Sequence, residues 1–347
     1  MSNPFQAQAS GPAPRMIGES ACFLEMQEHI SRVAPLNKSV LIVGERGTGK
    51  ELIAARLHYL SPRWEGDFLK VNCAAMSESL LEAQLFGHEA GAFTGATKLR
   101  KGYFERADGG TLFLDELATT AMSVQEKILR VIEYGEFERL GGSETLRVDV
   151  RLVAATNEDL PALARRGRFR VDLLDRLAFD VVTLPPLRMR GEDILVLAEH
   201  FAVGMVKELG GEAFMGFSDR VQNALVRYSW PGNIRQLKNV VERAVYQSEE
   251  AVVSELIFDP FESPYRLGGH SISAVPPLPE EEGELSPAPA GSSAADFKAA
   301  VAEFEIGLLT QALEKAQFNQ KKAAEQLGLS YHQLRGYLRK YELLGSP

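Results

Sequence analysis

The sequence predicts an α/β domain on a mainly parallel sheet, followed by a helical subdomain and a separate all-α domain. Three observations predict this architecture. Short apolar runs at 40–43, 111–114 and 150–155 alternate with helical segments, as in a buried parallel sheet. Residues 191–258 have helical periodicity without such runs. A polar, Pro-rich stretch then separates them from a last helical pattern that extends to about residue 344.

The 347 residues exceed the usual length of one domain, and changes in composition divide them into five segments. We expect a flexible tail at 1–16, an α/β subdomain at 17–190, a helical subdomain at 191–261, a linker at 262–295 and a helical domain at 296–347.

Bulk composition is that of a cytoplasmic protein. No apolar run approaches the 18 residues that could span a membrane, and the N-terminus has no secretory signal. Cys22 and Cys73 are too few for a disulfide framework or a metal site. The formal net charge of −9 argues against a protein that coats nucleic acid over its whole surface, but it allows a small basic DNA-reading module.

A glycine-rich loop follows the first predicted strand. Residues 44–50 read GERGTGK, which fits the phosphate-loop pattern between the strand 40–43 and a helix at 51–60. Glycines let backbone N–H groups surround phosphate oxygens, and the helix N-terminus adds partial positive charge. Glu51 stands where a hydroxyl residue commonly ligates Mg²⁺. We expect ATP to contact Gly44, Glu45, Arg46, Gly47, Thr48, Gly49, Lys50 and Glu51, with Lys50 on the β- and γ-phosphates.

Two carboxylates end the predicted strand 111–114, about 65 residues after Lys50. An Asp-Glu pair alone is usually a solvated loop, but together with a phosphate loop it indicates nucleotide hydrolysis. We assign Asp115 to Mg²⁺ bound with the nucleotide, and Glu116 to orienting or deprotonating the attacking water.

A short Gly-rich string lies between these two motifs and reads Gly91-Ala92-Phe93-Thr94-Gly95-Ala96. It resembles the loop with which bacterial enhancer-binding proteins, the AAA+ activators of sigma-54 RNA polymerase, contact the sigma factor. The GTGKE form of the phosphate loop is also typical of that family. The resemblance implies a mobile loop inserted within a helix, with Phe93 exposed as an aromatic anchor, Thr94 as a hydroxyl contact and glycine hinges.

The same resemblance implies roles for single residues that would otherwise be helix caps or surface charges. Asn72 would pair with Glu116 and link hydrolysis to loop movement. Thr156 and Asn157 would sense the γ-phosphate, and Arg235 would be the second sensor, in the helical subdomain.

Arg170 and Arg176 match the arginine fingers that members of this family insert into the neighbouring subunit's site. Fingers supplied in trans require a head-to-tail contact, so we expect a homo-oligomer, from a dimer to a hexameric ring. The alternative is an arginine-rich helix start.

Residues 319–340 are typical of a helix-turn-helix and resemble the Fis-type DNA-binding domain. Gly328 would cap the first helix, Ser330 and Gln333 would begin the second, and Leu334 and Leu338 would face inward. Five basic residues against one acid give a local charge of about +4. Residues expected to meet DNA are Lys321, Lys322, Tyr331, His332, Gln333, Arg335, Arg339 and Lys340. A helix at 296–316 would dimerise; the alternative for this domain is a small protein-binding module.

The resemblance covers residues 17–341 and implies an α/β AAA+ P-loop ATPase with a helical lid, plus an all-α Fis-type helix-turn-helix domain. Such a protein binds enhancer DNA and uses ATP hydrolysis to convert the sigma-54 RNA polymerase closed complex into an open one. A DNA-binding repressor whose ATPase only controls oligomerisation is the alternative, although such repressors usually lack an intact GAFTGA. The helix-turn-helix disfavours an AAA+ unfoldase.

Only about 16 residues precede the predicted ATPase, so control in cis by a receiver or ligand-sensing domain is not expected. Residues 35–38, 44–51 and 58–64 resemble the branch of the family that activates phage shock genes. That resemblance implies inhibition in trans by phage shock protein A, with Trp64 as a contact if its side chain is exposed.

Overall fold

The computed structural model describes residues 16–211, 213–248 and 252–261, and in the C-terminal region 306, 309–313, 316, 320–327 and 331–341. Contacts divide the chain into two units, Met1–Leu267 and Gly268–Pro347. The predicted linker at 262–295 and residues 1–15 of the predicted tail lie outside the described residues. Within the described part, every helix is too short or too polar to cross a membrane.

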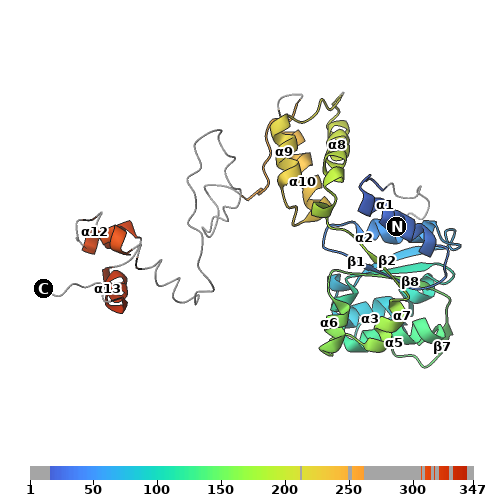
Figure 1. The fold of residues 1–347 in the computed structure, drawn as a ribbon. Coiled ribbons are helices and arrows are strands. Elements are labelled where there is room, and N and C mark those ends of the chain that lie inside the picture. Colours follow the sequence, from blue (N-terminus) through green and yellow to red (C-terminus); the bar gives the residue numbers. More distant parts are fainter. Residues whose placement is uncertain are drawn as a thin grey trace. The chain divides into compact units, whose positions relative to one another are not determined.

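A five-stranded parallel sheet forms the centre of the first unit (Figure 1). The strands lie in the order β2–β5–β8–β1–β9, with bounds Phe68–Asn72, Thr111–Asp115, Arg151–Thr156, Val40–Val43 and Asp180–Thr183. The three strands predicted from apolar runs are confirmed as β1, β5 and β8. Because every pair is parallel, the carboxyl ends of all five strands lie along one edge of the sheet.

Helices cover both faces of this sheet (Figure 1). Phe113 of β5 faces one side, with α1 (Ala21–Val33) and α2 (Lys50–Tyr59), while Leu112 and Leu114 face the other. That second side is covered by α3 (Glu78–Phe86), α5 (Met122–Tyr134), α6 (Leu160–Arg165) and α7 (Val171–Leu177). Burial on both faces explains why the parallel strands read as continuous apolar runs.

Short elements connect the layers on the second side. The hairpin of β3 (Gly87–His88) and β4 (Arg100–Lys101) leads into α4 (Tyr103–Arg106), and a second hairpin joins β6 (Glu136–Glu138) to β7 (Thr145–Arg147). Single 3₁₀ turns, η1 (Cys73–Ala75), η2 (Leu117–Thr119) and η3 (Leu187–Met189), follow β2, β5 and β9.

A helical subdomain follows η3, as the periodicity predicts. It consists of α8 (Gly191–Glu208), α9 (Asp219–Arg227) and α10 (Asn233–Gln247). At its centre the Trp230 side chain is fully buried, and its indole N–H donates to the carbonyl oxygen of Leu225 at 2.8 Å. The rings of Tyr228 and Phe258 pack against the indole, with centroids 5.0 and 5.8 Å away.

The described residues of the second unit include the helices α12 (Gln320–Gln326) and α13 (Tyr331–Lys340), and residues 309–313 are also helical. Leu334 and Leu338 are fully buried, as predicted, and share a core with Leu309, Leu313 and Ala323. Gly328 and Ser330, at the predicted turn, lie outside the described residues, as does most of the predicted dimerisation helix.

The Trp230 core generates a stability prediction. Trp230→Ala removes a fully buried aromatic side chain and its hydrogen bond, so we expect the free energy of unfolding to fall by about 3–5 kcal/mol. Urea denaturation followed by circular dichroism measures this loss. Tyr246→Ala is the control, because that side chain is 68% exposed on α10 and should change stability by less than about 0.5 kcal/mol. Equal effects of both changes would contradict the packing argument.

Candidate functional site

The phosphate-loop residues connect β1 to α2 at the carboxyl edge of the sheet. Gly47 (φ +79°) and Gly49 (φ +96°) adopt left-handed backbone conformations that residues with a Cβ rarely adopt. A Cβ on Gly47 would also lie only 2.3 Å from the carbonyl oxygen of Gly232 in the helical subdomain. Both glycines are therefore needed for the loop to curl at the N-terminus of α2, where partial positive charge favours phosphate.

Lys50 lies inside this curl, and its side chain is largely buried. Its amine donates to the carbonyl oxygens of Gly44 at 3.0 Å and Glu45 at 3.3 Å, and the Thr48 hydroxyl also donates to Glu45, at 2.8 Å. Burial lowers the pKa of Lys50, while the carboxylates of Glu116 and Asp115 oppose that shift. Glu51, also predicted here, instead forms an exposed ion pair with Lys70.

Asp115 and Glu116 lie at the end of β5, at the same edge. Glu116 has a left-handed backbone (φ +54°), which is uncommon outside glycine and tends to occur at functional sites. Its N–H donates to the Asp115 carboxylate at 3.0 Å. The nearest cation recorded for Glu116 is Arg46, with Nε and Oε1 3.8 Å apart. This contact between the phosphate loop and the acidic pair was not anticipated from the sequence.

The polar residues that end β2 and β8 lie beside this pair. Asn72 is in register with Asp115. Its side-chain oxygen accepts the N–H of Ala74 at 2.9 Å and is not bonded to Glu116, the partner expected from the sequence. The Thr156 hydroxyl accepts the N–H of Glu158 at 3.0 Å. The side-chain oxygen of Asn157 is buried and has no hydrogen-bond partner among the described residues. Such an orphaned polar atom in an active-site edge indicates a place for water or ligand.

The helical subdomain closes over the phosphate loop. The Arg235 N–H donates to the Gly47 carbonyl oxygen at 3.2 Å, which puts Arg235 at the predicted site. The Glu45 side chain points to this subdomain as well. It accepts two hydrogen bonds from Arg188, at 2.6 and 2.9 Å, and one from the Asn233 amide at 3.0 Å. These bonds, those from Arg188 first, lower the pKa of Glu45 to about 2.

A cavity of about 180 Å³ adjoins the phosphate loop between the two subdomains. Its walls are mainly apolar, and a flat heterocycle beside the phosphates would be held there by apolar contact. Its lining comes from five separate segments, so no sequence motif could have revealed it. The lining residues are Met16, Ile17, Phe23, Met26, Thr48, Gly49, Leu52, Ile53, Leu184, Pro185, Arg190, Leu197, His200, Phe201 and Ile234.

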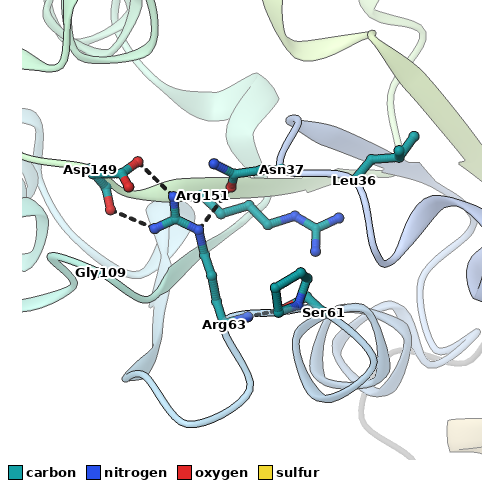
Figure 2. A pocket seen from close by; sticks show the side chains of 8 residues that line it. Leu36, Asn37, Ser61, Arg63, Gly109, Asp149 and Arg151 are labelled. Atoms are coloured by element: carbon teal, nitrogen blue, oxygen red, sulfur yellow. Dashed lines mark hydrogen bonds and ion pairs between the residues drawn. The ribbon is translucent and has the colours of Figure 1, made fainter.

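A larger hollow of about 350 Å³ lies at the opposite edge of the sheet, where β5 and β8 begin. Figure 2 shows Arg63 reaching across it to Asp149, with an ion-pair distance of 2.6 Å. Arg151 is 3% exposed and donates to backbone carbonyls, including that of Ala34 at 2.8 Å. Both arginines therefore already have partners, and the hollow is distant in topology from the phosphate loop. We do not regard it as the active site.

The two predicted arginine fingers are on α7 and its N-cap, and both contact carboxylates of their own chain. Arg170 bonds Asp172 at 2.8 Å, which raises the pKa of Arg170, and lies 3.4 Å from Glu126. Arg176 is 60% exposed and bonds Glu133 at 2.9 Å. The ion pairs are on the surface and contribute little to stability, so both arginines can exchange partners at small cost.

The GAFTGA residues form a compact loop at the end of the β3–β4 hairpin. The Gly91 N–H donates to the Ala96 carbonyl oxygen at 2.7 Å, and Gly91 and Gly95 have φ of +85° and +100°. Phe93 is 48% exposed and packs edge-on against the His88 ring, with centroids 4.9 Å apart. Thr94 is exposed, whereas Ala96 is buried. Ala92 packs against Gly141 of the β6–β7 connection.

The inserted loop takes the form of a hairpin between two helices, because α3 ends at Phe86, β3 and β4 follow, and α4 begins at Tyr103. Gly87 has φ +77°, and a Cβ there would lie 2.5 Å from the Arg100 carbonyl oxygen. This close approach of two backbones stops the helix and starts the strand pair. The residue that sequence reasoning missed is Arg139, which binds Glu89 at 2.8 Å and Glu105 at 2.9 Å and so supports the hairpin from behind.

The predicted DNA-contacting residues are only partly described. Arg335, Lys322 and Lys340 have exposed side chains on α12 and α13, opposite the buried leucines. The side chains of Lys321, Tyr331, His332, Gln333 and Arg339 lie outside the described residues.

The described residues contain no cluster of three or more His, Cys, Asp or Glu side chains that could hold a metal alone. Mg²⁺ in nucleotide sites is typically held by one or two carboxylates together with phosphates, so the single carboxylate pair of Asp115 and Glu116 is compatible with it. The buried amine of Lys50 and the orphaned oxygen of Asn157 also fit a bound triphosphate and its water.

Three family profiles match the chain in succession. The Sigma-54 interaction domain matches residues 16–183, the AAA+ ATPase lid domain matches 188–260, and the bacterial regulatory protein Fis family matches 300–341.

Individual relatives align along most of the chain. The Psp operon transcriptional activator of Escherichia coli K12 is 54% identical over 94% of this chain and 98% of its own length. Nitrogen fixation protein VnfA of Azotobacter vinelandii is 42% identical, and the match covers 94% of this chain but 59% of that protein. A solved structure of NtrX from Brucella abortus has a TM-score of 0.66 and 32% identity, and the match covers 94% of this chain and 69% of that chain. The structure of NtrX with ADP also has a TM-score of 0.66, with 31% identity, and the match covers 94% of this chain and 70% of that chain.

The acidic pair generates the first activity prediction. Glu116→Gln keeps the size of the side chain but cannot accept a proton, so we expect ATP to bind within about threefold of native affinity while hydrolysis falls by about 10²–10⁴-fold. Fluorescent-nucleotide titration and phosphate release measure the two quantities. Glu208→Gln, an exposed carboxylate at the end of α8, is the control. Native turnover in Glu116→Gln would show that another group activates the water.

Proposed function

Because this chain belongs to the sigma-54-dependent transcriptional activators, the bacterial enhancer-binding proteins, we propose that it opens promoters of phage shock genes by ATP-driven remodelling of sigma-54 RNA polymerase. One observation carries the proposal. An intact GAFTGA loop is exposed on a hairpin of the same domain that carries the phosphate loop and the acidic pair. The relative at 54% identity, whose length this chain nearly spans, supports the phage shock genes as targets.

The protein is an AAA+ ATPase, and the sheet edge indicates how its residues divide the work. Lys50 and the backbone of the phosphate loop bind the triphosphate, and Asp115 holds Mg²⁺, which neutralises charge on the phosphates. Glu116 orients the attacking water. Thr156, Asn157 and Arg235 surround the same edge from β8 and the lid, where they respond to loss of the terminal phosphate.

We further propose a homo-oligomeric ring of the head-to-tail type. Arg170 and Arg176 contact only carboxylates of their own chain in the recorded ion pairs, and Arg176 is 60% exposed. A neighbouring subunit's triphosphate is a stronger partner for a guanidinium than a solvated carboxylate, because it carries more charge. Ring closure would therefore complete each active site in trans.

The expected result of loop movement is contact between Phe93 or Thr94 and the sigma factor. The backbone has space beside its two glycines, since Cβ atoms built on Gly91 and Gly95 would meet nothing within 4 Å. The nucleotide edge and the loop are connected through β2, α3 and β3, and Asn72 lies at the beginning of that path. We therefore place the origin of the movement at Asn72, where exchange of the bond from Ala74 for a bond to Glu116 would start it.

Inhibition in trans by phage shock protein A is also part of this proposal. Trp64 is 56% exposed, which is unusual for a side chain of its size, and exposed tryptophans frequently anchor protein partners. The turn that carries it is fixed by Arg63, which bonds Asp149 and Asn37. Because the DNA and polymerase that it binds are cytoplasmic in bacteria, we assign the protein to the cytoplasm.

The loop assignment is tested by trapping. Native protein mixed with sigma-54 and ADP–aluminium fluoride, which mimics the hydrolysis transition state, should form a complex that is visible on a native gel. Thr94→Ala should abolish the complex while ATP turnover stays within about threefold, since Thr94 is distant from the nucleotide edge. Thr97→Ala, an exposed threonine just outside the motif, should still form it. Failure of the native protein to form a complex, while it hydrolyses ATP, would refute the activator mechanism.

The DNA-binding assignment is tested at Arg335, which is exposed on α13. Arg335→Ala should weaken binding by about 1–3 kcal/mol, because a guanidinium contact to a base or phosphate is lost. Fluorescence anisotropy on a duplex selected from random sequences by the native protein measures the change. Gln311→Ala, an exposed residue outside the two helices, is the control. Equal affinities for native and Arg335→Ala protein would place the DNA contact elsewhere.

A further inference from the structure

The Glu45 carboxylate joins three segments that are far apart in the sequence. It belongs to the phosphate loop, but both of its oxygens are bonded to residues outside that loop. Arg188, in η3 between the two subdomains, donates to each oxygen, at 2.6 and 2.9 Å. The Asn233 amide, at the start of α10, donates to one of them at 3.0 Å.

Asn233 fixes the other side of this junction. It is fully buried and has a left-handed backbone (φ +51°), so it sits in a conformation that the surroundings must enforce. Its side-chain oxygen accepts the Leu187 N–H at 2.8 Å, and its nitrogen also donates to the Arg46 carbonyl oxygen at 3.0 Å. The oxygen and both N–H donors of one amide thus hold the connector, the lid helix and the phosphate loop together.

The junction lies directly beside the predicted second sensor. Arg235 follows Asn233 by two residues, and its N–H is bonded to the Gly47 carbonyl oxygen at 3.2 Å. Gly47 has no room for a Cβ because the carbonyl oxygen of Gly232 would lie 2.3 Å away. The N-terminus of α10 therefore rests against the phosphate loop itself, and a small rotation of the lid would move the Arg235 side chain relative to the phosphates.

The ion pair between Glu45 and Arg188 contributes little to the stability of the protein. Glu45 and Arg188 are 43% and 47% exposed, and pairs with this exposure contribute little to stability in water. The two hydrogen bonds are nevertheless bidentate, which fixes the angle as well as the distance between the groups. The hydrogen bonds from Arg188 and Asn233 lower the pKa of Glu45 to about 2, so the carboxylate is ionised at neutral pH. Orientation, rather than stability, is what this geometry supplies.

We propose that Glu45 is a positioning residue that orients the lid through Arg188 and Asn233, and thereby places Arg235 for hydrolysis without itself holding the nucleotide. This inference rests on the proposed role of Arg235 as the second sensor. It assigns Glu45 a different task from the phosphate contact expected from its place in the GERGTGK motif, because both of its carboxylate oxygens are bonded to Arg188 and Asn233.

The test separates binding from turnover in the full-length protein. Glu45→Ala and Arg188→Ala should each leave the dissociation constant of a fluorescent ATP analogue within about threefold of native, while kcat falls by about ten- to a hundredfold, as expected for a misplaced group. The double variant should be no slower than the slower single variant, because both act through one junction. Glu45→Gln, which keeps an oxygen acceptor for Asn233, should recover part of the lost kcat.

Two further measurements test whether Glu45 acts through Arg235 and through Asn233. Adding Glu45→Ala to Arg235→Ala should slow hydrolysis no further than Arg235→Ala alone. Hydrogen exchange at the Leu187 amide, which donates to Asn233, should become faster in Glu45→Ala. Lys238→Ala is the matched control, because it breaks an ion pair with Glu242 on the same helix away from the junction.

Several results would overturn the inference. Nucleotide affinity that falls as much as kcat in Glu45→Ala would make Glu45 a nucleotide ligand. If the Glu45→Ala variant hydrolyses ATP with the kcat of the native protein, the junction has no role in hydrolysis. The proposed function would still stand. Native kcat in Arg235→Ala would instead refute the sensor assignment on which the inference rests.

Discussion

The parallel register of β5, β8 and β1 is the constraint on which the rest of the molecule depends. Parallel strands end on the same side, so the turns after all three lie together although they are separated by up to about a hundred residues in sequence. The phosphate loop, the acidic pair and the sensor residues come from those three turns. The apolar run of each strand, buried by helices on both faces, is what makes this edge rigid.

Two movable parts are attached to that rigid edge by different kinds of contact. The lid is attached by directional hydrogen bonds at Glu45 and Asn233, together with a tight backbone contact at Gly47. The GAFTGA hairpin is attached through Gly87, where two backbones touch, and through Arg139, which bonds two carboxylates. Both attachments are polar or backbone contacts at the margin of the sheet, whereas the strands themselves are held by apolar packing on both faces.

The distribution of charge also separates the two edges of the sheet. At the carboxyl edge a buried lysine faces two carboxylates, a balance that a triphosphate and a divalent cation would change. At the opposite edge the Arg63 charge is paired with Asp149, and Arg151 donates its hydrogen bonds to backbone carbonyl oxygens, so both guanidinium groups beside the larger hollow already have hydrogen-bond partners (Figure 2). Cavity size alone would therefore select the wrong edge.

The sequence by itself determined the α/β order, the three apolar strands and the local motifs, because each depends on residues that are neighbours in the chain. It also predicted the inward leucines of α13 from their spacing. Tertiary structure alone decided that Glu45 bonds the lid, that Arg46 approaches Glu116, and that a cavity opens between Phe23 and Ile234. It also decided that the inserted loop is a hairpin between α3 and α4. Each of these depends on distances between segments that are remote in the chain, and one-dimensional patterns carry no information about those distances.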